Sequence, residues 1–163
     1  MSMEVIIIHQ NKKDFLDLLL LADEQEDMID RYLERGTLFA LYDGDLKSTC
    51  VVTHESCDAQ GDDTYAVQSL ATYPQYQRMG YGRYLVNYVC EYYGGKGRTM
   101  LVGTGDVPSS TSFYERSGFV FSHRVENYIV EHYDKPIFED GVQLKDKVYL
   151  KRSLDTQAAG RGT

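Results

Sequence analysis

The spacing of apolar residues predicts a strand and two helices in the first part of the chain. Val5 to Ile8 is a run of β-branched residues, which is typical of a buried strand. From Lys12 to Ala22 the apolar residues recur at helical spacing, and a similar pattern runs from about Glu24 to Glu34. Because glycine commonly follows the last residue of a helix, we expect the second helix to end before Gly36.

The next part of the chain has the pattern of three strands. Apolar and β-branched residues dominate from Thr37 to Tyr42 and from Leu46 to His54, and Asp43-Gly44-Asp45 has the chemistry of a hairpin turn between them. The polar segment from Glu55 to Asp63 predicts a loop. A third strand is expected from about Thr64 to Thr72.

The second half of the chain alternates between helical and strand patterns. The expected elements are a helix from about Tyr81 to Tyr92, a flexible connector from Gly94 to Gly97, a strand from Arg98 to Thr104, a helix from Pro108 to Gly118, a strand from Phe119 to Val130, a connector from Tyr133 to Gly141, and a strand from Gln143 to Lys151. The last residues, 153–163, are mostly small and polar, and we expect them to form a mobile tail.

The order of these elements, β-α-α-β-β-β-α-β-α-β-β, predicts the fold class. It favours an α+β (mixed α/β) domain with helices on both faces of one sheet, not a doubly wound parallel sheet. Strands joined by hairpins are expected to be antiparallel, whereas the strands that begin near Thr64 and Arg98 are joined by a helix and are expected to be parallel. The length of 163 residues fits a single domain, which we assign to residues 1–152.

Composition and charge exclude several classes of function. No apolar run reaches the roughly 20 residues that span a bilayer, and the N-terminus lacks the features of a signal peptide. Cys50, Cys57 and Cys90 form no metal-binding pattern, so we expect a cytoplasmic protein without a metal, in which Cys50 and Cys90 are buried hydrophobic residues. The net charge of −8 argues against nucleic acid as a partner. It is compatible with a cationic acceptor and equally with simple solubility.

The stretch Gln77-Arg78-Met79-Gly80-Tyr81-Gly82 carries the strongest chemical indication. It follows a predicted strand and opens a predicted helix, so its backbone N–H groups can converge at a helix N-terminus, where they bind phosphate oxygens. The two glycines permit unusual backbone angles and let an anion approach the chain closely. Arg78 and Arg83 would add charge. Taken alone, a Gly-x-Gly turn before a helix is more often ordinary turn chemistry.

The neighbours of this stretch point to a family. The run from Leu70 to Gly82 resembles the acetyl-CoA-binding motif of the GNAT family of N-acetyltransferases, which is a strand, a proline-containing turn and then Gln/Arg-x-x-Gly-x-Gly/Ala at the start of a helix. The segment Ser112 to Phe119 resembles the second hallmark of that family, a Tyr-x-x-x-Gly-Phe sequence that ends a helix. The likeness is strong over residues 65–122, and the order of elements agrees along the whole chain.

The resemblance implies a splayed central sheet that opens between the strands ending near Thr72 and Thr104, where acetyl-CoA would bind. Strand residues Leu70, Ala71 and Thr72 would pair with the pantetheine arm, and the N–H of Leu70 would stabilise the oxyanion. Tyr114 would contact the cofactor near its sulfur and protonate the leaving thiolate. The turn that would hold the pyrophosphate comprises Gln77, Arg78, Met79, Gly80, Tyr81, Gly82 and Arg83.

Two positions depart from the family pattern. Many relatives have an asparagine upstream of the motif tyrosine that binds the pantetheine arm, and here Ser110 is the candidate substitute. Gln68 stands where some relatives carry an acidic residue that takes the proton of the amine, so it is not a base. An ordered water is one alternative route for that proton, and the candidate side chains are His54, Glu55, Glu126, Glu131 and His132.

The resemblance therefore predicts an N-acetyltransferase that moves an acetyl group to a primary amine by direct attack in a ternary complex. Because the chain is acidic, a small-molecule amine such as an amino sugar, a polyamine or an amino-acid derivative is expected as acceptor, with a protein amine as the alternative. The resemblance is also compatible with a homodimer. Another alternative is a non-catalytic domain that binds acyl-CoA as a sensor or an interaction module. A dinucleotide or P-loop site is disfavoured because Gly-x-Gly-x-x-Gly and Gly-Lys-Ser/Thr are absent.

Overall fold

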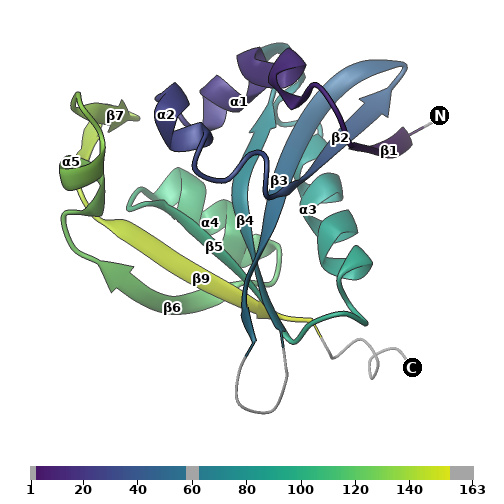
Figure 1. Ribbon diagram of the computed structural model, residues 1–163. Coiled ribbons are helices and arrows are strands. Elements are labelled where there is room, and N and C mark those ends of the chain that lie inside the picture. Colours follow the sequence, from purple (N-terminus) through teal and green to yellow (C-terminus); the bar gives the residue numbers. More distant parts are fainter. Residues whose placement is uncertain (1–2, 58–62, 155–163) are drawn as a thin grey trace.

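The computed structural model describes residues 3–57 and 63–154 and contains a seven-stranded sheet with helices on both faces (Figure 1). The strand order across the sheet is β1-β2-β3-β4-β5-β9-β6. The strands are β1 (Met3–Ile8), β2 (Thr37–Asp43), β3 (Asp45–Cys57), β4 (Asp63–Thr72), β5 (Thr99–Gly105), β6 (Val120–Val125) and β9 (Lys147–Ser153). Neighbouring strands are antiparallel except β4 and β5, so the predicted mostly antiparallel mixed sheet is confirmed.

Short helices and one hairpin complete the described part of the chain. They are η1 (Lys12–Phe15), α1 (Leu16–Ala22), α2 (Glu26–Ile29), η2 (Pro74–Tyr76), α3 (Tyr81–Tyr92), α4 (Pro108–Arg116), α5 (Tyr128–His132), and the hairpin of β7 (Ile137–Glu139) with β8 (Val142–Leu144). No helix in residues 3–57 or 63–154 is long and apolar enough to cross a membrane.

Alternation along β2 and β3 determines which helices cover which face of the sheet. Leu38 and Val51 pack with the apolar residues of α1 and α2, whereas Phe39 and Cys50 pack with α3 on the opposite face. This follows from the two-residue period of a strand, because successive side chains point to opposite faces. Cys50 is fully buried, as the sequence predicts, and Cys90 is 3% exposed in the same cluster.

The sheet opens in its middle. β4 and β5 are paired only from Thr64 to Val67 and from Thr99 to Val102, although β4 continues to Thr72 and β5 to Gly105. Figure 1 shows the two strands side by side at one end and diverging toward the other. The predicted opening between the ends of these strands is therefore present.

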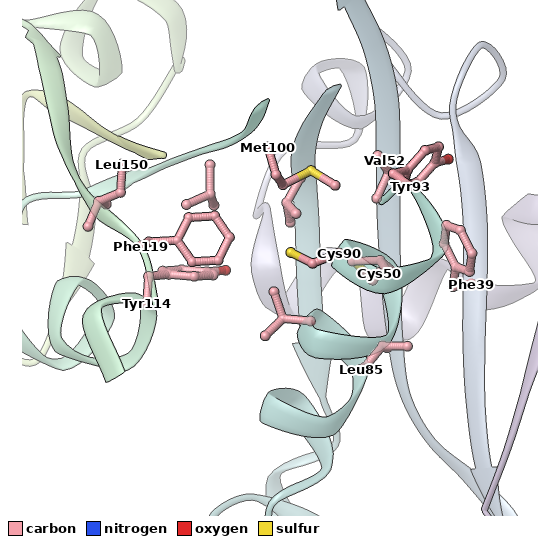
Figure 2. Close-up of a cluster of buried hydrophobic side chains, with 14 of the residues drawn as sticks. Phe39, Cys50, Val52, Leu85, Cys90, Tyr93, Met100, Tyr114, Phe119 and Leu150 are labelled. Atoms are coloured by element: carbon pink, nitrogen blue, oxygen red, sulfur yellow. The ribbon is translucent and has the colours of Figure 1, made fainter. Parts of the chain in front are cut away.

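The larger hydrophobic cluster bridges the two halves of the sheet (Figure 2). Tyr114 belongs to α4, Phe119 to the connection between α4 and β6, and Leu150 to β9. Leu85 and Cys90 come from α3. All of these side chains are less than a tenth exposed. Burying this apolar surface is what holds α3 and α4 on the same side of the divided sheet.

The predicted second helix is shorter than its apolar pattern suggests. α2 ends at Ile29, although Leu33, four residues later, remains buried. The buried ammonium of Lys12 donates hydrogen bonds to the carbonyl oxygens of Leu33 (3.0 Å), Glu34 (3.2 Å) and Gly36 (2.7 Å). These bonds satisfy carbonyl groups at the end of the segment, so the chain can turn into β2 without completing the helix.

The region after β6 also differs from the prediction. The expected strand to Val130 ends at Val125, because Asn127 adopts a left-handed conformation and donates its N–H to Asp146 at 2.9 Å, and α5 follows. The expected connector contains the hairpin of β7 and β8, with Asp140 and Gly141 both at positive φ. The expected loop from Glu55 to Asp63 is in part strand, since β3 extends to Cys57. The predicted mobile tail, residues 153–163, begins too early, because Ser153 belongs to β9 and Leu154 is buried in the larger hydrophobic cluster; residues 155–163 lie outside the described residues.

Candidate active site

A cavity of about 1120 Å³ lies where β4 and β5 diverge. One end is lined by the turn after η2, the first residues of α3 and side chains of α4. The other end is lined by the segment from α1 to α2, by α5, and by side chains of β9. The cavity therefore connects the predicted cofactor turn with a region in which an acceptor can bind.

The turn before α3 presents unpaired backbone N–H groups. Arg78 and Gly80 have positive φ angles of 66° and 91°, and Gly80 is the N-cap of the twelve-residue α3. The N–H of Gln77 bonds to a carbonyl within η2, and that of Tyr84 bonds to Gly80. Between these two, the N–H groups of residues 78–83 have no hydrogen-bond partner within the described part of the chain. Such a set of free donors at a helix N-terminus favours an anionic ligand.

Hydrogen bonds from three side chains hold this turn in place. The hydroxyl of Tyr76 donates to Asp45 at 2.9 Å, and that of Tyr81 donates to Asp43 at 2.7 Å, so both tyrosines tie the turn to the hairpin between β2 and β3. The amide of Gln77 donates to the carbonyl of Thr72 at 3.1 Å. The side chains of Gln77 and Tyr81 thus stabilise the turn through these hydrogen bonds, and their backbone atoms form part of the turn.

Helix α4 packs against the first turn of α3. A Cβ placed on Gly82 would lie 3.5 Å from the ring of Phe113 and 3.6 Å from Oγ1 of Thr72, which is ordinary contact. Arg83 donates a hydrogen bond to the carbonyl of Arg116 at 3.3 Å, and both side chains line the cavity. Phe113 and Arg116 were not predicted from the sequence as site residues, because the family motif in α4 assigns a role only to Tyr114.

The predicted strand residues lie along the unpaired part of β4. Leu70 and Thr72 line the cavity, while the Ala71 side chain is 6% exposed and belongs to the opposite face of the strand. On their other side these residues pair with β3, Leu70 with Cys50 and Thr72 with Ser48. Met79 is 61% exposed and does not line the cavity, so only its backbone belongs to the turn.

Tyr114 combines burial with a free hydroxyl. Its side chain is 8% exposed, packs edge-on against Phe113 and Phe119, and lines the cavity. In Figure 2 its hydroxyl points from α4 toward the α3 half of the cluster. The hydroxyl makes no hydrogen bond with a described residue. Burial raises the pKa of Tyr114 well above its usual value, with smaller contributions from Cys50 and Glu139, so the hydroxyl keeps its proton at neutral pH.

Ser110 reaches the cavity but already has a partner. Its hydroxyl donates to Glu139 of β7 at 3.1 Å, and the neighbouring Ser109 donates to Asp140 at 2.6 Å. The hairpin of β7 and β8 is therefore docked on the N-terminal end of α4. An Asp-Gly pair between two short apolar stretches is a standard hairpin signature, so this element was detectable in the sequence at residues 137–144.

Glu55 is the one candidate base of the five that lines the cavity. Its Oε2 accepts hydrogen bonds from the side chains of Thr53, Gln68 (3.3 Å) and Arg35 (3.3 Å), whereas Oε1 has no partner among the described residues. The remaining candidates, His54, Glu126, Glu131 and His132, do not line the cavity. The structure thus places a carboxylate from β3 beside Gln68, the β4 position where the sequence lacks an acid.

The far end of the cavity holds residues that no sequence pattern predicts. Tyrosine side chains gather there, and Tyr32 and Tyr133 donate hydrogen bonds to Asp23 at 3.0 and 2.7 Å. Lys147 and Arg31 also line this end. No motif marks these residues, because they come from the turn after α2, the loops beside α1 and α5, and β9, which only the folded chain brings together.

Comparisons with known proteins agree with this architecture. An acetyltransferase of the GNAT family from Elizabethkingia anophelis, solved with acetyl-CoA bound, has a TM-score of 0.85 over 93% of this chain and 97% of its own, at 24% identity, which shows the shared fold. A Bacillus subtilis acetyltransferase solved with CoA has a TM-score of 0.81 over 93% of this chain and 99% of its own, at 29% identity. The fold is therefore that of an acetyltransferase.

The sequence itself identifies the family. The family model described as acetyltransferase (GNAT) matches residues 7–119. The uncharacterized N-acetyltransferase YvbK of Bacillus subtilis (strain 168) is 32% identical over 147 residues, which is 89% of this chain and 92% of that protein. This chain belongs to the GNAT acetyltransferase family.

Proposed function

We propose that the protein transfers an acetyl group from acetyl-CoA to a small primary amine by direct attack within a ternary complex. The observation that carries this proposal is the continuous cavity between β4 and β5, which brings the free N–H groups of residues 78–83, the hydroxyl of Tyr114 and the carboxylate of Glu55 to one space. The two structures solved with acetyl-CoA or CoA support the identity of the acetyl donor.

Acetyl-CoA binds with its pyrophosphate on the turn before α3. The N–H groups of residues 78–83 donate to the phosphate oxygens, and Arg78, Arg83 and Arg116 contribute positive charge nearby. The pantetheine arm lies along the unpaired edge of β4, where a backbone N–H, assigned to Leu70, donates to the thioester oxygen as negative charge develops on it.

Proton transfers accompany the attack. The amine attacks the thioester carbon after losing a proton to Oε1 of Glu55, directly or through one water. As the carbon–sulfur bond breaks, Tyr114, which is protonated at neutral pH, donates its proton to the sulfur of CoA. The second proton on the attacking nitrogen passes through water to Tyr114 as the amide forms, and Glu55 releases its proton to solvent. The acetyl group is then bonded to nitrogen, so neither an enzyme nucleophile nor an acyl-enzyme is needed.

The far end of the cavity, here called the acceptor end, is enclosed by side chains. This enclosure favours a small molecule over a protein segment as the acceptor. Side chains from α2, α5, β7 and β9 surround this end, and they include Met28, Ile129, Ile137 and Tyr149. A protein acceptor would need an open groove across these elements. The homodimer and the cytoplasmic location stay predictions.

Release of CoA in the presence of amines tests the proposed transfer. With saturating acetyl-CoA and a panel of amino acids, polyamines, amino sugars and lysine peptides, at least one small amine is expected to raise CoA release above the rate without acceptor. Tight acetyl-CoA binding with no acceptor-dependent release across the panel would instead support the alternative function, a non-catalytic acyl-CoA sensor.

Replacing Gly82 by valine is expected to weaken acetyl-CoA binding at least tenfold. The fold tolerates the new side chain, because a Cβ at this position meets only ordinary contacts with Phe113 and Thr72. The added bulk instead blocks close approach of the pyrophosphate to the N–H groups at the start of α3. Isothermal titration gives the affinity, and thermal unfolding checks that stability is retained.

Gly95 offers the matched control, since a Cβ there meets nothing within 4 Å and the residue does not line the cavity. Gly95→Val should bind acetyl-CoA like the wild type. Equal affinity of Gly82→Val and the wild type would remove the pyrophosphate role of this turn.

A further inference from the structure

Two cations at the acceptor end of the cavity lack an anionic partner. Nζ of Lys147 lies 4.6 Å from the ring centre of Tyr128 and 5.2 Å from that of Tyr149, and it makes no hydrogen bond or ion pair with a described residue. The guanidinium of Arg31 has only a 3.5 Å contact with the sulfur of Met28. Together they offer several unused donors to the cavity.

Packing holds the Lys147 side chain in this position. A Cβ placed on Gly103 of β5 would overlap Cε of Lys147 and would lie 2.9 Å from the ring of Tyr149. The stem of Lys147 therefore crosses the bare backbone of Gly103, and the two tyrosine rings lie close to the ammonium. A lysine held in this way has lost much of the freedom that lets an exposed lysine reach water.

The two carboxylates that attract Lys147 electrostatically, Asp23 and Glu55, are already engaged by other donors. Oδ1 and Oδ2 of Asp23 each accept a tyrosine hydroxyl, and Glu55 pairs with Arg35. Burial lowers the pKa of Lys147, and Arg31 lowers it further, while Tyr128, Asp23 and Glu55 act in the opposite direction. A partly buried ammonium without an acceptor is costly, and an anionic ligand would relieve this cost.

We propose that the acceptor is a small primary amine that also bears a carboxylate, as amino acids do, and that Lys147 and Arg31 bind the carboxylate. The proposal rests on the proposed acetyl transfer and specifies its acceptor. Lys147, Glu55 and the unpaired edge of β4 line the same cavity, so a molecule whose carboxylate is at Lys147 can present its amine to the proposed base and to the thioester. Ile129 and Tyr149 also line the cavity, and their apolar surfaces can contact an aliphatic or aromatic side chain of the acceptor.

Among the small amines expected from the sequence, the local charges of the cavity favour an amino acid over a polyamine. A charge of −8 over the whole chain attracts cationic ligands at long range. A ligand inside the cavity interacts mainly with the hydrogen-bond donors and charges that line it. In the acceptor end, those donors belong to Lys147 and Arg31. A polyamine would place positive charge beside both of them and leave their donors unpaired.

Binding of reaction products tests the proposal without requiring turnover. N-acetyl amino acids and their uncharged N-acetyl amides are titrated into the CoA-loaded protein, with alanine, leucine and phenylalanine as the parent residues. The carboxylates are expected to bind at least tenfold more tightly than the amides in one or more of these pairs. Lys147→Met is expected to abolish this preference, and Lys147→Arg to retain most of it.

A matched control and a kinetic readout complete the test. Lys145→Met removes the same charge from an exposed position outside the cavity and should bind both members of each pair like the wild type. In turnover, Lys147→Met should raise KM for the carboxylate acceptor more than it lowers kcat. Equal affinity for carboxylates and amides, or an unchanged preference in Lys147→Met, would overturn the proposal, even if CoA binding and acetyl transfer are normal.

Discussion

Replacing Tyr114 by phenylalanine is expected to lower kcat by roughly 100-fold while changing the affinity for acetyl-CoA by less than about twofold. The hydroxyl has no hydrogen-bond partner in the described structure, so its removal leaves no buried group unpaired and should not destabilise the fold. The loss of rate follows because the thiolate of CoA must then leave without a proton donor. Steady-state CoA release and isothermal titration measure the two quantities separately.

Tyr93 provides the control for removing a buried tyrosine hydroxyl. It is 6% exposed, belongs to the same hydrophobic cluster as Tyr114, and does not line the cavity. Tyr93→Phe should keep the wild-type kcat. If Tyr114→Phe also keeps the wild-type kcat, then Tyr114 is not the acid, and its burial serves packing alone.

Replacing Glu55 by glutamine is expected to reduce kcat by roughly 100-fold near neutral pH, because the amide cannot take the proton of the attacking amine. The substitution preserves the shape of the side chain and an acceptor oxygen for Thr53 and Gln68, so the local hydrogen bonds can persist. The deficit should shrink as pH rises, since a growing fraction of the free amine is already deprotonated in solution. A pH–rate profile of wild type and variant measures this directly.

Glu131 serves as the matched control for this change. It was an equal candidate in the sequence, yet it is exposed on α5 and does not line the cavity. Glu131→Gln should leave the pH–rate profile unaltered. A Glu55→Gln variant whose profile overlays that of the wild type would assign the proton transfer to water instead.

Local patterns predicted the strands around the opening and the helix α3 because propensity, periodicity and packing agree there. The segment from Leu38 to Val52 alternates between two buried faces, and the turn before α3 carries glycine where φ is positive, at Gly80. The errors lie where a distant partner decides the local structure. Lys12 satisfies carbonyl groups more than twenty residues away and shortens α2, and Asp146 binds the N–H of Asn127 and ends β6 early.

The candidate site divides in the same way. The end of the cavity proposed to bind acetyl-CoA is formed largely by two short stretches of sequence, one around Gly80 and one around Tyr114. Short motifs therefore predict it. The acceptor end is assembled from separate segments, and the chemistry of Lys147 depends on the bare backbone of Gly103 and on the rings of Tyr128 and Tyr149. Periodicity cannot report such contacts, because each residue alone is typical of an ordinary surface or core position.

Whether the cavity between β4 and β5 binds acetyl-CoA is measured by isothermal titration of the purified protein, with NADH and ATP as controls. We expect saturable binding of acetyl-CoA at one site per chain and much weaker binding of NADH and ATP, because the turn before α3 and the unpaired edge of β4 would recognise pyrophosphate and pantetheine together. Absence of acetyl-CoA binding, or equal binding of all three ligands, would contradict the assignment of the cavity between β4 and β5 as an acetyl-CoA site.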